Sequence, residues 1–172
     1  MFNTVIDLDP TDHITVDTFG ASEERTFVLQ AQAGERLVTL TIDSDQLLAL
    51  SIAGNELLDI LDEEYSRELY LLRIPSPELL ALRSPIDPLF EIAQFQLGYD
   101  ADRDTLLIIV VELPANLALE HTDLAVVRFW ISREQMVALR RQIDQVLGIS
   151  PRICPGCGQP IEAGAHKCIR NN

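Results

Sequence analysis

Three observations predict an α+β protein. Short apolar runs that end at turn residues are typical of β-strands joined by tight turns. Two other segments place apolar residues at helical spacing behind a capping residue. The order strand-strand-strand-helix is found twice along the chain, in residues 12–65 and 89–148. We therefore expect duplicated β-β-β-α units that form a mainly antiparallel sheet with two helices on one face.

The first half contains three candidate strands and one helix. Residues 13–19 alternate in polarity, and residues 25–31 and 36–42 follow after turns at Gly20 and Gly34. Glycine suits such turns because it tolerates a positive φ. Asp43 or Ser44 is then placed to cap a helix, in which leucines recur at helical spacing to about residue 64.

The second half repeats this order. Strands are expected at residues 90–99, 105–113 and 123–131, and the middle one is almost continuously apolar, like a strand covered on both faces. Ser132 and Gln135 have the spacing of a capping box at the start of a second helix. The segments 42–50 and 131–139 match closely, which favours a repeat over a coincidence of capping motifs. We expect six strands, either as one sheet or as a highly curved half-barrel.

Residues 66–88 are expected to link the two halves. Four of the nine prolines of the chain lie between Pro75 and Pro88. Proline-rich connections without helical or strand periodicity are typical of crossing loops. A crossover between the halves is the favoured interpretation, and a lid over a site is the alternative. Residues 1–150 are thus assigned to the body and residues 151–172 to a separate tail.

Composition restricts the class of protein. The chain has 172 residues, 47% of them hydrophobic, which predicts a globular protein with a real core. Its formal net charge of −14 argues against nucleic acid as a partner, because phosphate binding needs clustered Lys and Arg. No apolar run reaches membrane-spanning length, and the first ten residues carry acids where a signal peptide has bases. A cytoplasmic location is expected.

The tail carries the most specific motif. All three cysteines lie there, in the pattern Cys-x2-Cys followed by His-x-Cys. This spacing predicts a zinc knuckle, and four protein ligands leave no coordination position for a catalytic water. We therefore expect one structural zinc ion per chain. The predicted ligands are Cys154, Cys157, His166 and Cys168.

Three other interpretations of the tail stay open. A redox dithiol normally precedes a helix directly after a strand, whereas proline and glycine surround Cys154 and Cys157. A disulfide framework conflicts with the odd number of cysteines and with a reducing compartment. The third alternative is a disordered tail with unliganded thiols.

The sequence contains no motif that announces a reaction. A phosphate-binding glycine loop, a Gly-x-Ser-x-Gly elbow and a His-Glu-x-x-His helix are all absent. His13 and His121 are expected to be solvated loop residues. Arg25, Gln30 and Gln46 either line a pocket or make cross-strand and capping contacts. An acidic cluster at the end of the first helix is interpreted as a solvated face, and its members are Asp59, Asp62, Glu63 and Glu64.

Several blocks together resemble the bacterial domain of unknown function 3090 family. They are Gly20, Arg25-Thr26-Phe27-x-Leu29-Gln30-Ala31, Gln46 before a leucine-rich helix, Leu97-Gly98-Tyr99-Asp100, and the tail motif from Cys154 to Asn171. The resemblance covers nearly the whole chain. It implies that Cys154, Cys157, His166 and Cys168 act as one unit. The family is uncharacterised, so the resemblance implies no reaction.

Three functional hypotheses follow from the sequence. The favoured one is a non-enzymatic binding or adaptor module with a structural zinc, whose partner is another protein. The alternative is an enzyme or small-ligand-binding protein with a site between the halves, formed by Arg25, Gln30 and acidic residues. A nucleic-acid-linked zinc protein is the third and the least compatible with the negative charge.

Overall fold

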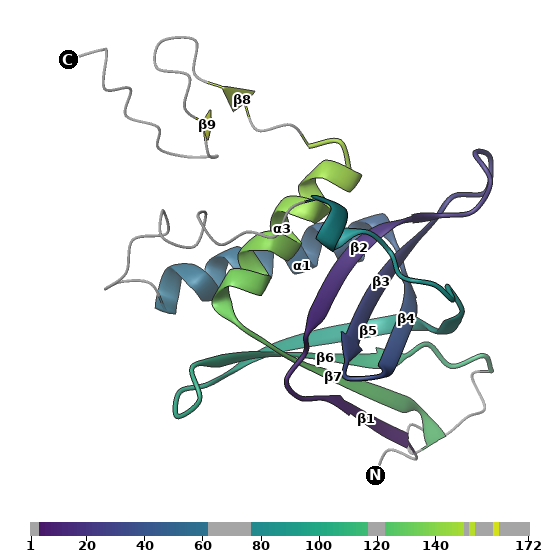
Figure 1. The fold of residues 1–172 in the computed structure, drawn as a ribbon, viewed down its shortest axis with the longest axis horizontal. Helices are drawn as coiled ribbons and strands as arrows, with labels where there is room; N and C mark the ends of the chain where they lie inside the picture. The colour runs from purple at the N-terminus through teal and green to yellow at the C-terminus, as the bar shows by residue number, and fades with distance from the viewer. Residues whose placement is uncertain (1–3, 62–76, 117–122, 150–151, 154–159, 162–172) are drawn as a thin grey trace.

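The computed structural model of the chain describes residues 4–61, 77–116, 123–149, 152–153 and 160–161. It confirms an α+β protein with a mostly antiparallel sheet and two helices (Figure 1). The two helices of the described residues are α1 (Ser44–Leu61) and α3 (Arg133–Val146), and a short 3₁₀ helix, η1, spans Pro77–Leu80. The strands of the main sheet are β1 (Thr4–Leu8), β2 (His13–Phe19), β3 (Thr26–Ala33), β4 (Arg36–Ile42), β5 (Pro88–Asp100), β6 (Thr105–Glu112) and β7 (Ala125–Ile131).

The main sheet has seven strands in the order β1-β7-β6-β5-β4-β3-β2. Strands β2, β3 and β4 pair antiparallel, as do β5, β6 and β7. The two sets meet where β5 lies parallel to β4, and β1 lies parallel to β7 at the other end. The expected six strands were therefore one too few, because β1 was missed.

One short bend connects the two edge strands of the sheet. These edge strands, β1 and β2, are consecutive in the chain, and the bend between them bonds to both ends of the sheet. The Thr11 N–H donates to the Trp130 carbonyl of β7 at 2.9 Å, and the Asp12 N–H donates to the Gln32 carbonyl of β3 at 2.8 Å. Backbone groups that an open sheet would leave unpaired at this place are thus satisfied.

One core cluster is shared by both sets of strands and both helices. Alternation along each strand points Val16, Leu29, Leu40 and Phe129 into one cluster, to which both sets of strands contribute. Figure 1 shows both helices on the same side of β5, β6 and β7, where α1 lies against α3. Gly54 allows this close approach, because a Cβ there would meet the Met136 sulfur at 2.6 Å.

The described part of the tail is one small hairpin. β8 (Arg152–Ile153) pairs antiparallel with β9 (Pro160–Ile161). Residues 154–159 connect these two strands in the sequence and lie outside the described residues. The assignment of residues 151–172 as a separate unit stays a prediction.

Candidate functional site

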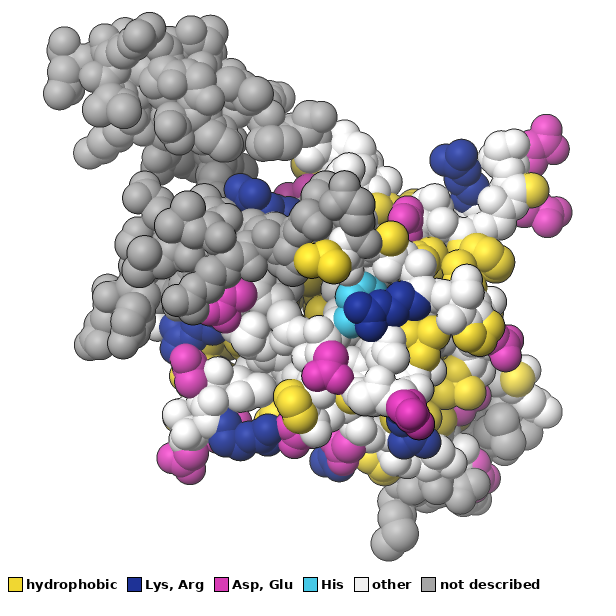
Figure 2. Space-filling view, in the orientation of Figure 1, with side chains coloured by type: hydrophobic (Ala, Val, Ile, Leu, Met, Phe, Trp, Pro, Cys, Tyr) yellow, Lys and Arg dark blue, Asp and Glu magenta, His cyan; other side chains and the backbone are white. Residues whose placement is uncertain are grey.

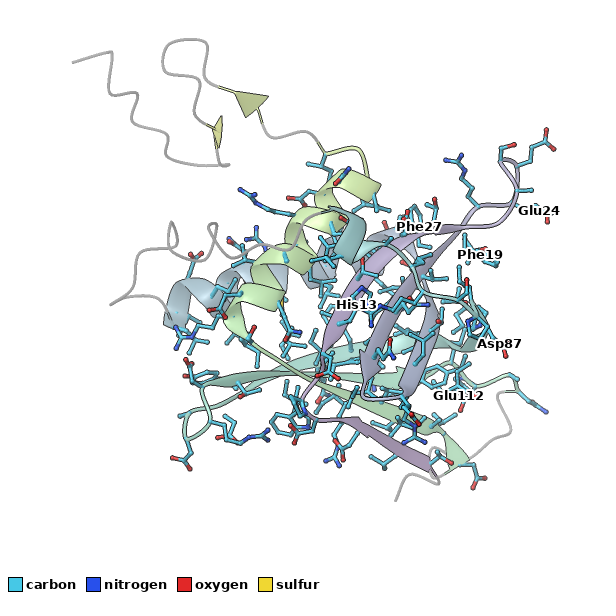
Figure 3. All side chains as sticks on the ribbon, viewed as in Figure 1. His13, Phe19, Glu24, Phe27, Asp87 and Glu112 are labelled. Atoms are coloured by element: carbon cyan, nitrogen blue, oxygen red, sulfur yellow. The ribbon has the colours of Figure 1, made fainter. Side chains whose placement is uncertain are left out.

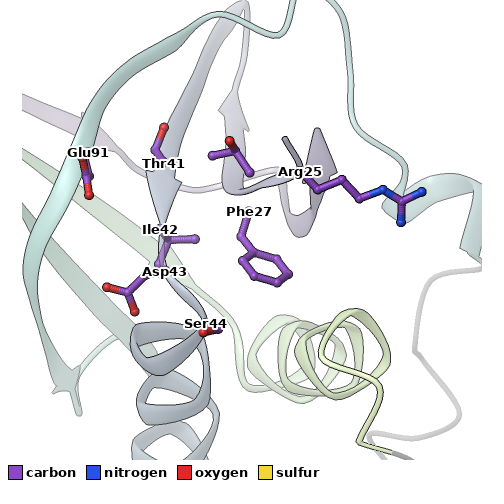
Figure 4. Close-up of a pocket in the computed structure, with 8 residues that line it drawn as sticks. Arg25, Phe27, Thr41, Ile42, Asp43, Ser44 and Glu91 are labelled. Atoms are coloured by element: carbon purple, nitrogen blue, oxygen red, sulfur yellow. The ribbon is translucent and has the colours of Figure 1, made fainter. Parts of the chain in front are cut away.

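A depression of about 320 Å³ lies where β4 and β5 run parallel, next to the start of α1. We call it the junction pocket. Figure 4 shows Phe27 and Ile42 in its middle, with Glu91 on one side and Arg25 on the other. The side chain of Arg25 extends outward at the rim. The lining residues are Arg25, Thr26, Phe27, Thr41, Ile42, Asp43, Ser44 and Glu91.

A capping box fixes the helical wall of the pocket. The Asp43 carboxylate accepts from the Gln46 N–H at 2.7 Å, and the Gln46 side-chain oxygen accepts from the Asp43 N–H at 3.1 Å. The Gln46 amide group also donates to the Ile92 carbonyl at 2.8 Å. This bond ties the first turn of α1 to β5, which carries Glu91. The glutamine is therefore a structural residue, one of the two roles that the sequence left open.

Two charges of the pocket have no partner within the described structure. Arg25 and Glu91 are both exposed, and neither side chain makes a hydrogen bond or an ion pair with a described residue. Asp43, in contrast, is occupied by the cap of α1. Among the described residues, the pocket thus has one cation and one carboxylate without a partner, on opposite sides of a partly apolar floor.

The same arrangement of backbone is found at the junction of β7 and β1. There Ser132 and Gln135 form the capping box of α3, with bonds of 2.9 and 3.1 Å. The Gln135 amide group donates to the Thr11 carbonyl at 2.8 Å. The first turn of each helix thus contains a capping glutamine whose amide donates across the junction, to β5 in the first case and to the bend that follows β1 in the second. This match makes Ser44 the counterpart of Arg133, since each directly follows its cap.

Arg133 fills the second junction. Only 9% of its surface is exposed. Its guanidinium donates to Asp104 at 2.8 Å, to the Tyr99 hydroxyl at 3.1 Å and to the Leu61 carbonyl at 3.1 Å. The hydrogen bond from Tyr99, together with that from Arg133, lowers the pKa of Asp104, whereas the same Asp104 contact raises the pKa of Tyr99. Asp104 directly precedes β6, as Arg25 directly precedes β3.

Ion pairs and an aromatic ring also occupy the outer side of the second junction. The Arg103 guanidinium lies 4.9 Å from the centre of the Trp130 ring and forms an ion pair with Asp9. The Trp130 N–H donates to Asp7 at 3.2 Å, and Arg128 pairs with the same carboxylate. The charges of this junction are therefore paired within the chain, unlike Arg25 and Glu91.

A matching sequence family is found for this chain. The family model described as "Protein of unknown function (DUF3090)" matches residues 6–168. The chain belongs to this family. The resemblance inferred from the sequence is thereby confirmed. Neither the curated proteins nor the solved structures contain a significant match.

Gln30, from the block of residues 25–31 that resembles the family, binds the segment that links the two halves. Thr15, Gln30 and Thr39 form one row across β2, β3 and β4 on the side away from the core. Gln30 accepts from the Arg83 N–H at 2.7 Å and donates to the Arg83 carbonyl at 2.9 Å, while Thr15 donates to the Leu80 carbonyl at 2.6 Å. Residues 77–87, which we call the strap, are thereby fixed to the sheet. Gln30 does not line the junction pocket.

His13 was expected in a solvated loop, and this expectation was wrong. It is the first residue of β2 and exposes only 6% of its surface (Figure 3). Figure 2 shows the histidine of this face next to a basic side chain that partly overlaps it. Neither ring nitrogen makes a hydrogen bond with a described residue. Burial lowers the pKa of His13, Arg83 lowers it further, and the Leu79 backbone raises it.

The predicted metal ligands lie outside the described residues. These are Cys154, Cys157, His166 and Cys168, and the same holds for His121 and for residues 62–64 of the acidic cluster. Asp59 is described and accepts from Asn55 at 3.3 Å on α1. Within the described ranges, no group of three or more His, Cys, Asp or Glu side chains is placed to hold a metal ion.

Sequence reasoning named Arg25 as a possible pocket residue but did not give Phe27, Ser44 or Glu91 that role. Phe27 lies in the family block and Ser44 was a candidate helix cap, whereas Glu91 belongs to no motif. One signal was available. When the sequences of the two helix starts are aligned, Ser44 corresponds to Arg133. A small side chain in one half therefore stands where the other half has a large cation.

Proposed function

We propose that this chain is a non-enzymatic binding protein whose recognition site is the junction pocket. The proposal rests on one observation: Arg25 and Glu91, which have no partner in the described part of the chain, lie beside the same depression. Both charges are exposed and solvated in the free chain, and a ligand that carries the two opposite charges would pair with them at this pocket. The hydroxyl groups that line the pocket, on Thr26, Thr41 and Ser44, have no histidine or lysine beside them in the lining to activate them as nucleophiles.

The second junction supports this proposal by contrast. There the position that corresponds to Ser44 carries Arg133, and the position that corresponds to Arg25 carries Asp104. Their ion pair fills the space next to the helix start. In the first half, the small Ser44 stands where the second half has Arg133, and this leaves room beside the helix. Arg25 stands where the second half has Asp104, so a cation takes the place of the carboxylate. These correspondences also support an internal duplication of the β-β-β-α unit.

The chemistry of the pocket favours a small zwitterionic ligand. A carboxylate group would pair with Arg25, which must rotate inward from the rim. An ammonium group would pair with Glu91, and the ligand backbone would cover Phe27 and Ile42 between them. Amino acids and short peptides have this combination of groups. A volume of about 320 Å³ is at the small end of ligand pockets.

An NMR titration with glycylglycine tests this site. We expect shift changes for the amides of Phe27, Ser44 and Glu91, because these residues line the pocket on three sides. N-acetylation of the dipeptide removes its cation, and amidation of its carboxyl group removes its anion. Each change should weaken binding by about tenfold or more.

Matched variants distinguish pocket binding from a general effect of charge. Arg25→Ala should weaken the binding of glycylglycine more than the binding of glycylglycine amide. Glu91→Gln should weaken the binding of glycylglycine more than the binding of its N-acetyl derivative. Arg36→Ala, at an exposed position outside the pocket, is the control. Shift changes that sodium chloride reproduces would show that the pocket has no specific site.

We also propose that the tail holds one structural zinc ion. Three thiolates and an imidazole are a ligand set that zinc favours, and the set is complete without water. The pairing of β8 with β9 supports the proposal, because it closes the loop that contains Cys154 and Cys157 into a hairpin. His166 and Cys168 would complete the tetrahedron. A role in fixing the tail follows, since such a short segment has little core of its own.

Metal analysis of the purified chain tests the zinc proposal. We expect about one zinc per chain, and a strong loss in Cys157→Ser, because the variant removes one of four ligands. His121→Ala is a matched control that removes a histidine outside the motif. An unchanged zinc content in Cys157→Ser would contradict the four-ligand assignment.

The zinc tail is also proposed to dock a protein partner in the cytoplasm, where thiols stay reduced. No described helix is both long and apolar enough to cross a membrane. A pull-down with the full chain and with a chain ending at Ser150 separates the two proposed sites. A partner that needs the tail should be lost in the shorter chain, whereas glycylglycine binding should persist.

A further inference from the structure

The strap covers part of the sheet on the side away from the core. It runs from η1 across β2 and β3 to the start of β5 (Figure 1). Beneath it, the buried side chains of Thr15 and Gln30 bond to the backbone of Leu80 and Arg83. Because these side chains are polar, water can replace the strap as their partner. Detachment of the strap therefore costs less free energy than unfolding of the core.

His13 lies beneath the strap, close to Leu79 and Arg83, and lacks hydrogen-bond partners. Since side chains alternate along a strand, it points to the same side of β2 as Thr15. Only 6% of the residue is exposed, and neither ring nitrogen bonds to a described residue. Buried polar groups without a partner are costly, and contact with water removes this cost. The closed strap thus covers a ring that gains hydrogen bonds when the strap opens.

The surroundings of His13 disfavour its protonation while the strap is closed. Burial and the Arg83 cation of the strap lower the pKa of His13, whereas the Leu79 backbone of η1 raises it. On β3, the residue paired with His13 is the neutral Gln32, which accepts from the Arg83 guanidinium at 2.6 Å. The neighbouring Asp12 carboxylate accepts from an N–H of the turn between β3 and β4 at 2.7 Å. Among the described residues of α3, which also packs against β2, no charged group shifts this pKa. A protonated ring is therefore more stable once the strap and its cation have moved away.

We propose that the strap is an acid-sensitive cover, which detaches from the sheet when His13 takes up a proton and leaves the rest of the fold in place. Because Thr15 and Gln30 bind backbone atoms of the strap, the surface that they form when uncovered fits a peptide segment of a partner. This inference is independent of ligand binding in the junction pocket.

Hydrogen exchange of the Arg83 amide in the full chain tests the proposal. This N–H donates to Gln30 at 2.7 Å, so it is protected from exchange while the strap is closed. After correction for the intrinsic effect of pH, its protection should fall by up to about tenfold for each pH unit below about 6.5. Low concentrations of urea should leave this exchange nearly unchanged, because detachment of the strap exposes far less surface than global unfolding does.

Three variants assign the fall in protection to His13. His13→Leu should abolish most of the fall, because leucine does not titrate. Arg83→Met keeps the backbone bonds to Gln30 but removes the cation beside the ring, so it should make the fall smaller, and it keeps the test valid if His13→Leu damages the fold. Arg36→Met, at an exposed position of β4, is the matched control and should leave the fall unchanged.

Three results would overturn the proposal, whichever result the glycylglycine titration gives. The first is a protection of the Arg83 amide that does not change between about pH 7.5 and 5.5 in the wild-type chain. The second is a fall of the same size in the wild type, His13→Leu and Arg83→Met. The third is an exchange of this amide that depends on urea as strongly as global unfolding, since the strap would then open only with the whole fold.

Discussion

The junction of β4 with β5 and the junction of β7 with β1 share a backbone plan but differ in what fills it. Each has a capping box whose glutamine reaches a carbonyl group across the junction, Gln46 in the first and Gln135 in the second. In the second, Arg133 is buried and makes three kinds of hydrogen bond. In the first, Ser44 leaves a hollow between Arg25 and Glu91.

This difference separates what the fold requires from what it permits. The capping glutamines are present at both junctions, so they belong to the stability of the fold. A filled junction is not required, since the chain folds with one of the two open. Groups that stay unpaired at the open junction are therefore candidates for function rather than for folding.

The largest expected effect is that of Arg133→Ala. Removal of the guanidinium leaves the Leu61 carbonyl and the Tyr99 hydroxyl without their donor and should lower the free energy of unfolding by about 2–3 kcal/mol. The Asp104 partner adds little, because its side chain is 61% exposed. Urea denaturation measures the change. Ser44→Ala, the matched variant at the open junction, should change stability by less than about 0.5 kcal/mol.

Intermediate and nearly equal effects are expected for the capping glutamines. Gln46→Ala and Gln135→Ala each remove a bond to the N-cap amide and a bond to a carbonyl across the junction. Each should cost about 1–2 kcal/mol in urea denaturation. The Glu56→Ala variant, on an exposed face of α1, controls for helix propensity. A large cost at one junction and none at the other would break the structural equivalence.

A smaller effect is expected in the pH dependence of stability. It arises in the first half only, where His13 lies beneath the strap. Its pKa is lowered from the usual 6.5 in the folded chain, so the unfolded chain binds the proton more tightly. The contribution of the neutral His13 ring to the free energy of unfolding should therefore be fully present above about pH 6.5. It should be lost progressively as the pH drops below that value. Urea denaturation as a function of pH measures this fall.

His13→Leu provides the control for this titration. It should remove part of the fall in stability between neutral and mildly acidic pH, and the difference from the wild type isolates His13 from the other histidines. Equal pH dependence of both chains would show that the buried ring does not titrate as the structure implies. Susceptibility of the strap to protease should rise with acid in the wild type alone.

Local patterns were sufficient to predict most elements of the fold. Alternating polarity and turn residues located six strands to within a few residues, and the Ser132 capping box is present as expected. Strand β1 was missed because its five residues are held by parallel pairing with β7, about 120 positions away in the sequence. No local pattern carries such a contact.

Burial by distant segments explains the other differences. His13 begins a strand that the alternation of residues 13–19 predicted, but its burial could not be predicted, because the strap that covers it comes from the link between the halves. Gln30 was named as a possible pocket residue and instead clamps Arg83. Arg25 does line a pocket, yet Glu91 on the opposite side could not be named, because only the parallel pairing of β4 with β5 brings it there.

The most direct measurement of the central claim is a double-mutant cycle at the open junction. Ser44→Arg and Arg25→Asp together recreate the arrangement of Arg133 and Asp104 in the first half. We predict a favourable coupling of about 0.5–1 kcal/mol in the free energy of unfolding, together with loss of glycylglycine binding as the new side chain fills the pocket. A coupling of zero or an unfavourable one would contradict the equivalence of the two junctions.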